Sequence, residues 1–312
     1  MGFRKQQLGR LRRLWYRHKS LEGIPQDEGL KDSFQRVQHY LDERLGTEER
    51  VPYLLGSCNI CGNFSAFFCP NKDLYRESLA CAQCRATSRY RSIARGILRA
   101  IRELNGVEAA SIAQLHHDEG GGRLRVYDTQ VPFYYNTCAY PIPDLLSKCN
   151  WIDLQTSLFQ PKKPFGDEVG PRTTNQNLES LTFPDDSFDL VITSDVMEHV
   201  RLDDRAHREI SRVLRRGGIY LFTVPHFRDR HDTLVRVAVT DPSDPGKDEF
   251  PMEKEYHGDA NSEEGRALSY RSYGTDLDDK LAELGFAVEY CKRDFHEFAI
   301  MNTELFFCRL SK

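Results

Sequence analysis

The stretch "FDLVITSD", residues 188–195, decides the fold. Its apolar and β-branched side chains are typical of a strand that is buried on both faces of a sheet. The charged segment "RAHREISRVLRRGG", 205–218, comes next and predicts an amphipathic helix that stops at its glycine pair. Its inward positions are Ala206, Ile210, Val213 and Leu214. A second apolar run, "IYLFTVP" at 219–225, predicts another buried strand, so the three segments form one unit of a parallel sheet.

Further strands and helices are expected on both sides of this unit. The predicted strands are "RLRVYDT" (123–129), "CNWIDL" (149–154), "AVEYC" (287–291) and "TELFFCRL" (303–310). The predicted helices are "PIPDLLSK" (141–148) and "TDLDDKLAELGF" (275–286). Strands that alternate with helices predict an α/β fold, with a mostly parallel sheet covered by helices on both faces. Ligands of such sheets bind at the carboxyl ends of the strands.

The charge of the chain is distributed unevenly. The net charge of the 312 residues is −4, but residues 1–20 contain seven basic residues and no acidic one, which leaves −11 for the rest. Residues 1–50 are therefore expected to form a basic helical arm, whose first 20 residues can contact a membrane surface or nucleic acid, followed by a connecting helix. A solvated or self-docked helix and an organelle-targeting segment are the alternatives. No apolar run approaches the ~20 residues of a transmembrane helix.

Four of the nine cysteines form two close pairs. Cys58, Cys61, Cys81 and Cys84 give the pattern C-x2-C-x19-C-x2-C. Four thiolates in two such turns suit a tetrahedral, structural zinc ion, and buried or redox-active thiols are the alternative. Because no secretory signal is visible, free or metal-bound thiols predict a reducing, cytoplasmic location. We call residues 51–105 the cysteine module; it includes a following helix, and a glycine-rich linker ends near Gly122.

The segment 177–226 resembles the class I S-adenosylmethionine-dependent methyltransferases. Its "NLESLTFPDDSFDLVITSDVMEHV" and "REISRVLRRGGIYLFTVPH" match most closely the type 11-like group, which has an "L-P-F-x-D-x-S-F-D" turn and "EH" after the fourth strand. A zinc-ribbon-like module before such a domain is similar to bacterial members of that group. The resemblance covers residues 122–312 and implies a Rossmann-like, seven-stranded sheet and S-adenosylmethionine as the cofactor.

The resemblance also places candidate cofactor-binding residues at strand ends. Asp153 is interpreted as the end of the second strand, where an acid binds the ribose hydroxyls, and Asn177 and Leu178 would flank the adenine. Further candidates end or follow other strands: Asp128, Gln130, Ser194 and Asp195. The loop after the first strand, 129–136, lacks the glycines that usually let a backbone approach a ligand. S-adenosylmethionine carries no phosphate, so a wider, glycine-free loop remains compatible with binding.

Three histidines are candidate catalytic bases. Methyl transfer is an in-line displacement, and a base is needed only where the acceptor keeps its proton until late. His199 and His226 follow the fourth and fifth strands, and His257 lies in the insertion 227–273, which is expected to bound the acceptor site. The alternative for each histidine is a structural role.

Three functions are compatible with these patterns. The first is methyl transfer to a small-molecule or glycan-type acceptor. The second is an RNA methyltransferase that holds nucleic acid with the cysteine module and the basic arm; the acidic remainder of the chain does not favour it. The third is a non-catalytic binding protein on a methyltransferase scaffold.

Overall fold

The computed structural model describes residues 53–311, except 70–73, 260–264, 292–297 and 302. The predicted basic arm and connecting helix at 1–50 lie outside the described residues. Within these ranges, no helix combines the length and the apolar character needed to span a membrane.

An eight-stranded sheet forms the centre of the structure, in the order β16-β17-β11-β10-β4-β7-β9-β8. In chain order the strands are β4 (Leu124–Asp128), β7 (Ile152–Leu158), β8 (Glu168–Gly170), β9 (Thr173–Asn175), β10 (Phe188–Ser194), β11 (Leu214–Thr223), β16 (Phe286–Cys291) and β17 (Leu305–Leu310). The five strands from β9 to β11 are parallel, and β17 is antiparallel to β11 and β16. The predicted α/β fold with a mostly parallel sheet is confirmed. The described sheet has eight strands instead of the expected seven, because β8 adds a short antiparallel edge.

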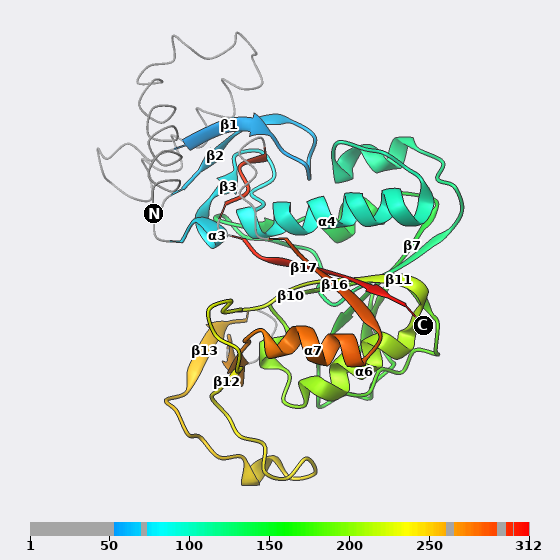
Figure 1. Ribbon diagram of the computed structural model, residues 1–312. Helices are drawn as coiled ribbons and strands as arrows, with labels where there is room; N and C mark the ends of the chain where they lie inside the picture. The colour runs from blue at the N-terminus through cyan, green and yellow to red at the C-terminus, as the bar shows by residue number, and fades with distance from the viewer. Residues whose placement is uncertain (1–52, 70–73, 260–264, 292–297, 302, 312) are drawn as a thin grey trace.

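Alternate residues of the central strands enter two different cores, because successive side chains of a strand point to opposite faces. Leu190, Ile192 and Leu221 face a core shared with α4 (Ser88–Asn105), α5 (Ile142–Leu146) and η2 (Ile112–His117). Val191 and Phe222 face a core shared with α6 (Asp203–Val213) and α7 (Asp276–Glu283). Figure 1 shows α4 on one side of the sheet and α6 with α7 on the other.

The helix predicted at 205–218 ends earlier than expected. It stops at Val213, and Leu214 already pairs with Phe188 as the first residue of β11. Between this pair and the next, Leu190 with Ile219, β11 has three extra residues, and Gly217 there takes a φ of 76°. The glycine pair therefore bulges a strand instead of ending a helix, since only glycine adopts this conformation readily.

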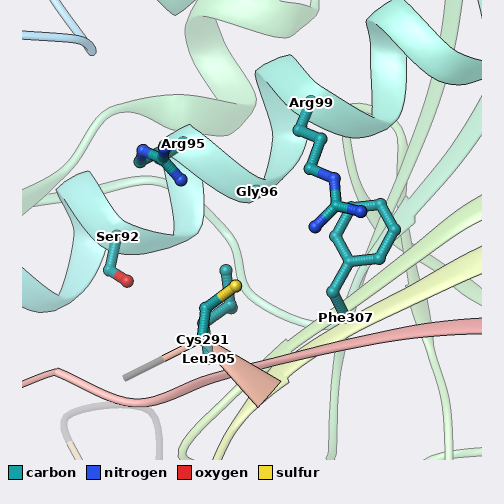
Figure 2. Close-up of a pocket in the computed structure, with 7 residues that line it drawn as sticks. All are labelled: Ser92, Arg95, Gly96, Arg99, Cys291, Leu305 and Phe307. Atoms are coloured by element: carbon teal, nitrogen blue, oxygen red, sulfur yellow. The ribbon is translucent and has the colours of Figure 1, made fainter. Parts of the chain in front are cut away.

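Helix α4 follows the cysteines in sequence but packs on the sheet. A Cβ atom at Gly96 would lie 2.7 Å from Leu305 Cδ2 and 3.3 Å from Leu221 Cδ1, so the missing side chain allows a close approach. Figure 2 shows Gly96 on α4 near Leu305, and Arg99 beside Phe307. The Arg99 guanidinium lies 4.0 Å from the centroid of the Phe307 ring. The last part of the cysteine module is thus a layer of the main domain.

A small antiparallel sheet is formed by β1 (Tyr53–Ser57), β2 (Phe64–Phe68) and β3 (Ala80–Cys81), with the short helix α3 (Tyr75–Ser78) before β3. Cys81 ends β3, and the other three cysteines of the group lie in the turns that follow β1 and β3. Arg91 of α4 joins this sheet to the rest of the chain. Its fully buried guanidinium donates hydrogen bonds to carbonyl oxygens on both sides, at Leu79, Ala86, Phe298 and Ala299. It also lies 4.4 Å from the ring centroid of Phe67. A planar group with five donors meets this set of acceptors.

The remaining elements lie in loops at the carboxyl ends of the parallel strands. After β4 comes the hairpin β5 (Phe133–Tyr134) and β6 (Ala139–Tyr140), and after β10 the turn η3 (Met197–His199). The insertion 227–273 contains β12 (Leu234–Val235), η4 (Pro245–Lys247), β13 (Glu255–Gly258), β14 (Arg266–Ser269) and β15 (Arg271–Ser272). Strands β13 and β14 form a hairpin, and β14 packs against η3.

Replacing Arg91 by lysine should lower the free energy of unfolding by about 3 kcal/mol or more, because a lysine cannot satisfy all four carbonyls and each buried unsatisfied group costs about 1–3 kcal/mol. Urea unfolding of the full chain measures this. The control is Arg102→Lys on the exposed face of the same helix, which should change stability little. Equal stability of the two variants would contradict the role assigned to Arg91.

Candidate active site at the carboxyl edge of the sheet

The carboxyl ends of the parallel strands bring several predicted residues to one edge. Asp128 ends β4 and Ser194 ends β10, and Asn177 follows β9 by two residues. Because neighbouring parallel strands end at the same edge, their following loops adjoin one another. Gln130 Nε2 donates a hydrogen bond of 3.1 Å to the Ser194 carbonyl oxygen and so connects two of these loops.

Asp128 is fully buried at the end of β4. Its carboxylate accepts a hydrogen bond of 2.6 Å from the Tyr140 hydroxyl and one of 3.0 Å from the Gln130 amide. Burial raises the pKa of this carboxyl to about 7, and the two hydrogen bonds oppose the shift. Through these two hydrogen bonds, Asp128 fixes both ends of the loop between β4 and β6.

The glycine-free loop keeps its polar atoms at the edge and turns its aromatic run away. Thr129 Oγ1 and Gln130 Oε1 are buried and have no hydrogen-bond partner among the described residues. Phe133 packs on Tyr90 of α4, with ring centroids 5.9 Å apart. Tyr134 and the residue after it are exposed by about half. Two orphaned oxygen atoms thus lie where the loop meets the sheet edge.

Asp195 makes the strongest ionic contacts at this edge. Arg76 pairs with both carboxylate oxygens at 2.6 Å, and Arg89 approaches to 3.0 Å. Thr223 Oγ1 donates a further hydrogen bond of 2.7 Å. Burial opposes the charge of Asp195, but the two guanidinium groups outweigh it and hold the pKa well below its usual range. Arg89 also donates to Ser194 Oγ at 3.1 Å, so both predicted residues contact the cysteine module.

Sequence reasoning missed the role of these two arginines. Arg89 looks like part of an exposed basic helix face, and Arg76 has no neighbouring pattern that marks it. Only the folded position of the cysteine module directs them at the sheet edge. Glu77 pairs with both arginines, and Arg89 also donates a hydrogen bond of 3.0 Å to the Tyr90 hydroxyl.

Asn177 and Leu178 follow the carboxyl end of β9. Asn177 Oδ1 accepts a hydrogen bond of 3.0 Å from the Glu179 amide, and its backbone pairs with Ser180. Leu178 is buried in the core shared with α6. Just after β9, the pair therefore combines an amide side chain with a neighbouring buried leucine.

Asp153 does not lie at this edge, and the prediction of its position was wrong. It is the second residue of β7 and stands level with Arg125, whereas Asp128 stands level with Thr156. The strand continues to Leu158 because its later residues pair with β9. Asp153 is therefore at the amino end, half exposed, where its nearest cation is Arg123 at 3.4 Å.

His199 and His257 come together, although 58 residues separate them. The hairpin β13–β14 places His257 Nδ1 3.1 Å from His199 Nε2. Glu198, fully buried, lies beneath both rings, and its Oε1 is 3.9 Å from each of those nitrogens. We call these three residues the histidine cluster. It forms because β14 packs on η3, a contact that chain spacing does not reveal.

His226 lies apart from this cluster, in the layer of β16 and β17. Its ring packs between Tyr290 and Phe306, with centroids 5.1 Å from each, and its side chain is 1% exposed. Burial lowers its pKa. These contacts do not favour the predicted role of His226 as a base. Tyr273, the last residue of the insertion, is also fully buried, and its hydroxyl donates a hydrogen bond to Asp203.

Comparison with known proteins gives a family match over part of the chain. Residues 146–222 match the family model described as a methyltransferase domain. This stretch runs from the end of α5 through β7, β9 and β10 to β11, and so includes most of the strands that form the edge described above.

Individual relatives match over limited parts. The "uncharacterized methyltransferase YcgJ" of Bacillus subtilis (strain 168) is 31% identical over 108 residues, which are 34% of this chain and 37% of that relative. A solved S-adenosylmethionine-dependent methyltransferase of Mesorhizobium loti is 18% identical, covers 60% of this chain and 91% of its own, and has a TM-score of 0.36. The 1,6-didemethyltoxoflavin-N1-methyltransferase of Burkholderia thailandensis, solved with S-adenosylhomocysteine, is 15% identical. The match covers 69% of this chain and 80% of that one, with a TM-score of 0.34.

The raised pKa of Asp128 predicts a pH-dependent stability. The folded carboxyl holds its proton up to about pH 7 and the unfolded one only to about pH 4, so the stability that this proton provides falls as pH rises through that window. Asp128→Asn should remove this loss of stability. Between pH 4 and pH 7, the stability of the variant relative to the unaltered chain should therefore rise by up to about 4 kcal/mol. Denaturant unfolding at a series of pH values measures this.

The exposed Asp153 supplies the control for this experiment. Asp153→Asn should follow the pH profile of the unaltered chain, because the side chain is half exposed. If Asp128→Asn also runs parallel to the unaltered chain, Asp128 is ionised over the whole window and the account of its burial is wrong.

Proposed function

We propose that this protein is an S-adenosylmethionine-dependent methyltransferase that acts on a small-molecule or glycan-type acceptor. The observation that carries the proposal is a pair of buried oxygen atoms at Thr129 and Gln130 that have no hydrogen-bond partner in the described part of the chain. They lie at the carboxyl edge of a sheet with a methyltransferase-domain match. Buried polar atoms without partners are rare in folded proteins, and at a sheet edge they favour a ligand.

The residues at the edge fit the cofactor. Gln130 and Thr129 can hydrogen-bond its amino-acid arm, and Asn177 can accept a hydrogen bond from the adenine amino group above the apolar Leu178. When bound, the cofactor supplies a sulfonium methyl group as the electrophile. Ser194 and Asp195 contribute indirectly: their contacts with Arg89 and Arg76 hold the cysteine module against the carboxyl edge of the sheet.

The acceptor is expected on the side of the histidine cluster. Burial lowers the pKa of His199, so its Nε2 lone pair is available near neutral pH for the proton of an acceptor hydroxyl. Glu198 is fully buried and His199 is only 17% exposed, so access is narrow. A narrow site supports a small acceptor. The arginines at this edge are paired with Asp195 and Glu77, and they offer no unneutralised charge for a nucleic acid.

We also propose that the cysteine module holds one structural zinc ion. The four sulfur atoms lie within 4.8 Å of one another, and Cys58 Sγ is 3.7 Å from Cys84 Sγ. Tetrahedral ligands at about 2.3 Å from zinc stand about 3.8 Å apart, so this spacing fits. The ion would fix the turns that position Arg76 and Arg89.

Isothermal titration with S-adenosylhomocysteine tests the cofactor proposal. The unaltered chain should bind it, and Gln130→Ala should bind about tenfold more weakly, because one buried hydrogen-bonding group is lost. Gln114→Ala is the control, since Gln114 bonds only the nearby Ala110 amide in the surface turn η2. Absence of binding by the unaltered chain at millimolar concentration would refute the proposal.

Elemental analysis of the purified chain should give about one zinc ion bound to thiolates. Cys81→Ser should lose this ion and much of the stability, because folding and metal binding are coupled in such sites. Cys291→Ser, in β16 and outside the group of four, should keep it. A stable unaltered chain free of zinc would show that the thiols serve another purpose.

A further inference from the structure

The hydrogen bonds around the histidine cluster determine which ring nitrogens carry protons. His199 Nδ1 lies 2.8 Å from the Leu268 carbonyl oxygen, which can only accept, so Nδ1 carries the proton and Nε2 carries a lone pair. His257 Nε2 lies 3.0 Å from Glu255 Oε1, so Nε2 donates to this carboxylate. In the neutral form, His257 Nδ1 then carries the lone pair. Two lone pairs face each other across 3.1 Å.

A third acceptor points at the same place. Both carboxylate oxygens of Glu198 are buried and have no hydrogen-bond partner among the described residues. Oε1 lies 3.9 Å from His199 Nε2 and from His257 Nδ1. The two ring nitrogens and Glu198 Oε1 are therefore three acceptor atoms that face one another without a hydrogen-bond donor among the described residues.

A single proton between the two rings does not resolve this arrangement. It would complete the contact between His199 and His257, but it would leave Glu198 with no donor. A metal ion can accept all three lone pairs at once. Ligand atoms about 2.1 Å from one ion stand roughly 3.0–3.4 Å apart, which fits the nitrogen–nitrogen distance, and a small side-chain rotation brings Glu198 within reach.

We infer that Glu198, His199 and His257 form a binding site for one divalent transition-metal ion, separate from the group of four cysteines. All three ligand atoms lie within 4.8 Å of one another. Two imidazoles and one carboxylate suit zinc, iron, cobalt or nickel better than magnesium, which prefers oxygen ligands. The hydrogen bonds to Leu268 and Glu255 orient the two rings, as outer partners of metal-bound histidines commonly do.

The site would keep open positions for an exogenous ligand. His199 and His257 are 17% and 32% exposed, so one side of the cluster faces solvent. The consequence for the acceptor rests on the proposed function: the ion would hold an oxygen-bearing acceptor at the carboxyl edge and lower the pKa of a coordinated hydroxyl. With an ion bound, the histidines would position the acceptor, and the proton of the coordinated hydroxyl would leave to solvent on the exposed side of the cluster.

Cobalt(II) titration of the zinc-loaded full chain tests the metal site. One cobalt ion per chain should bind with visible absorption bands but without the intense near-ultraviolet band of sulfur-to-cobalt charge transfer. His257→Ala and Glu198→Gln should weaken binding by about tenfold or more, as should Glu255→Gln, which removes an outer partner of His257. His231→Ala, an exposed histidine of the same insertion, should bind like the unaltered chain.

Three results would overturn the inference: no cobalt binding at millimolar concentration, equal binding by His257→Ala and the unaltered chain, or a sulfur charge-transfer band. Glu255→Gln keeps the test informative if the other variants do not fold, because Glu255 is 42% exposed. S-adenosylhomocysteine binding is measured on the same preparations. Cobalt binding without cofactor binding would refute the proposed function and leave the metal site standing, and the reverse result would do the opposite.

Discussion

The negative charge of Asp195 at the end of β10 organises the whole carboxyl edge. Two guanidinium groups from the cysteine module neutralise it, and Thr223 completes its contacts from β11. An ion pair removed from solvent is stable only when geometry and hydrogen bonding are good, and the bidentate contact of Arg76 provides both. Through this charge, the small antiparallel sheet is held against the last two parallel strands, β10 and β11, and the hydrogen bond from Gln130 to the Ser194 carbonyl adds the glycine-free loop.

The fold could be predicted from sequence because its signals are local. The apolar run of β10 and the alternation of strands and helices follow from side-chain periodicity, which the sheet imposes on each element separately. The boundary of α6 could not be placed, because Gly217 is equally suited to end a helix or to bulge a strand. The end of β7 was misplaced for a similar reason: Gln155, Thr156 and Ser157 are polar and become strand through pairing with β4 and β9.

The candidate site was predictable only in part, because its residues come from three distant parts of the chain. Strand ends placed Gln130, Asn177 and Ser194 at one edge, as parallel topology requires. The position of Asp153 depended on where one strand begins, and the ring of His226 turned toward Tyr290 and Phe306. The approach of His257 to His199 depends on how a 47-residue insertion, 227–273, folds back, and no spacing rule describes that.

Helix α4 starts among the cysteine-bearing strands and ends as a cover for the main sheet. A polypeptide that started after this helix would leave Leu190, Ile192 and Leu221 without their packing partners, and a fragment that stopped after it would carry an uncovered apolar stripe. Neither half is a self-sufficient folding unit. Loss of order around the thiols would therefore spread through α4 into the sheet, so that the molecule melts as one cooperative body.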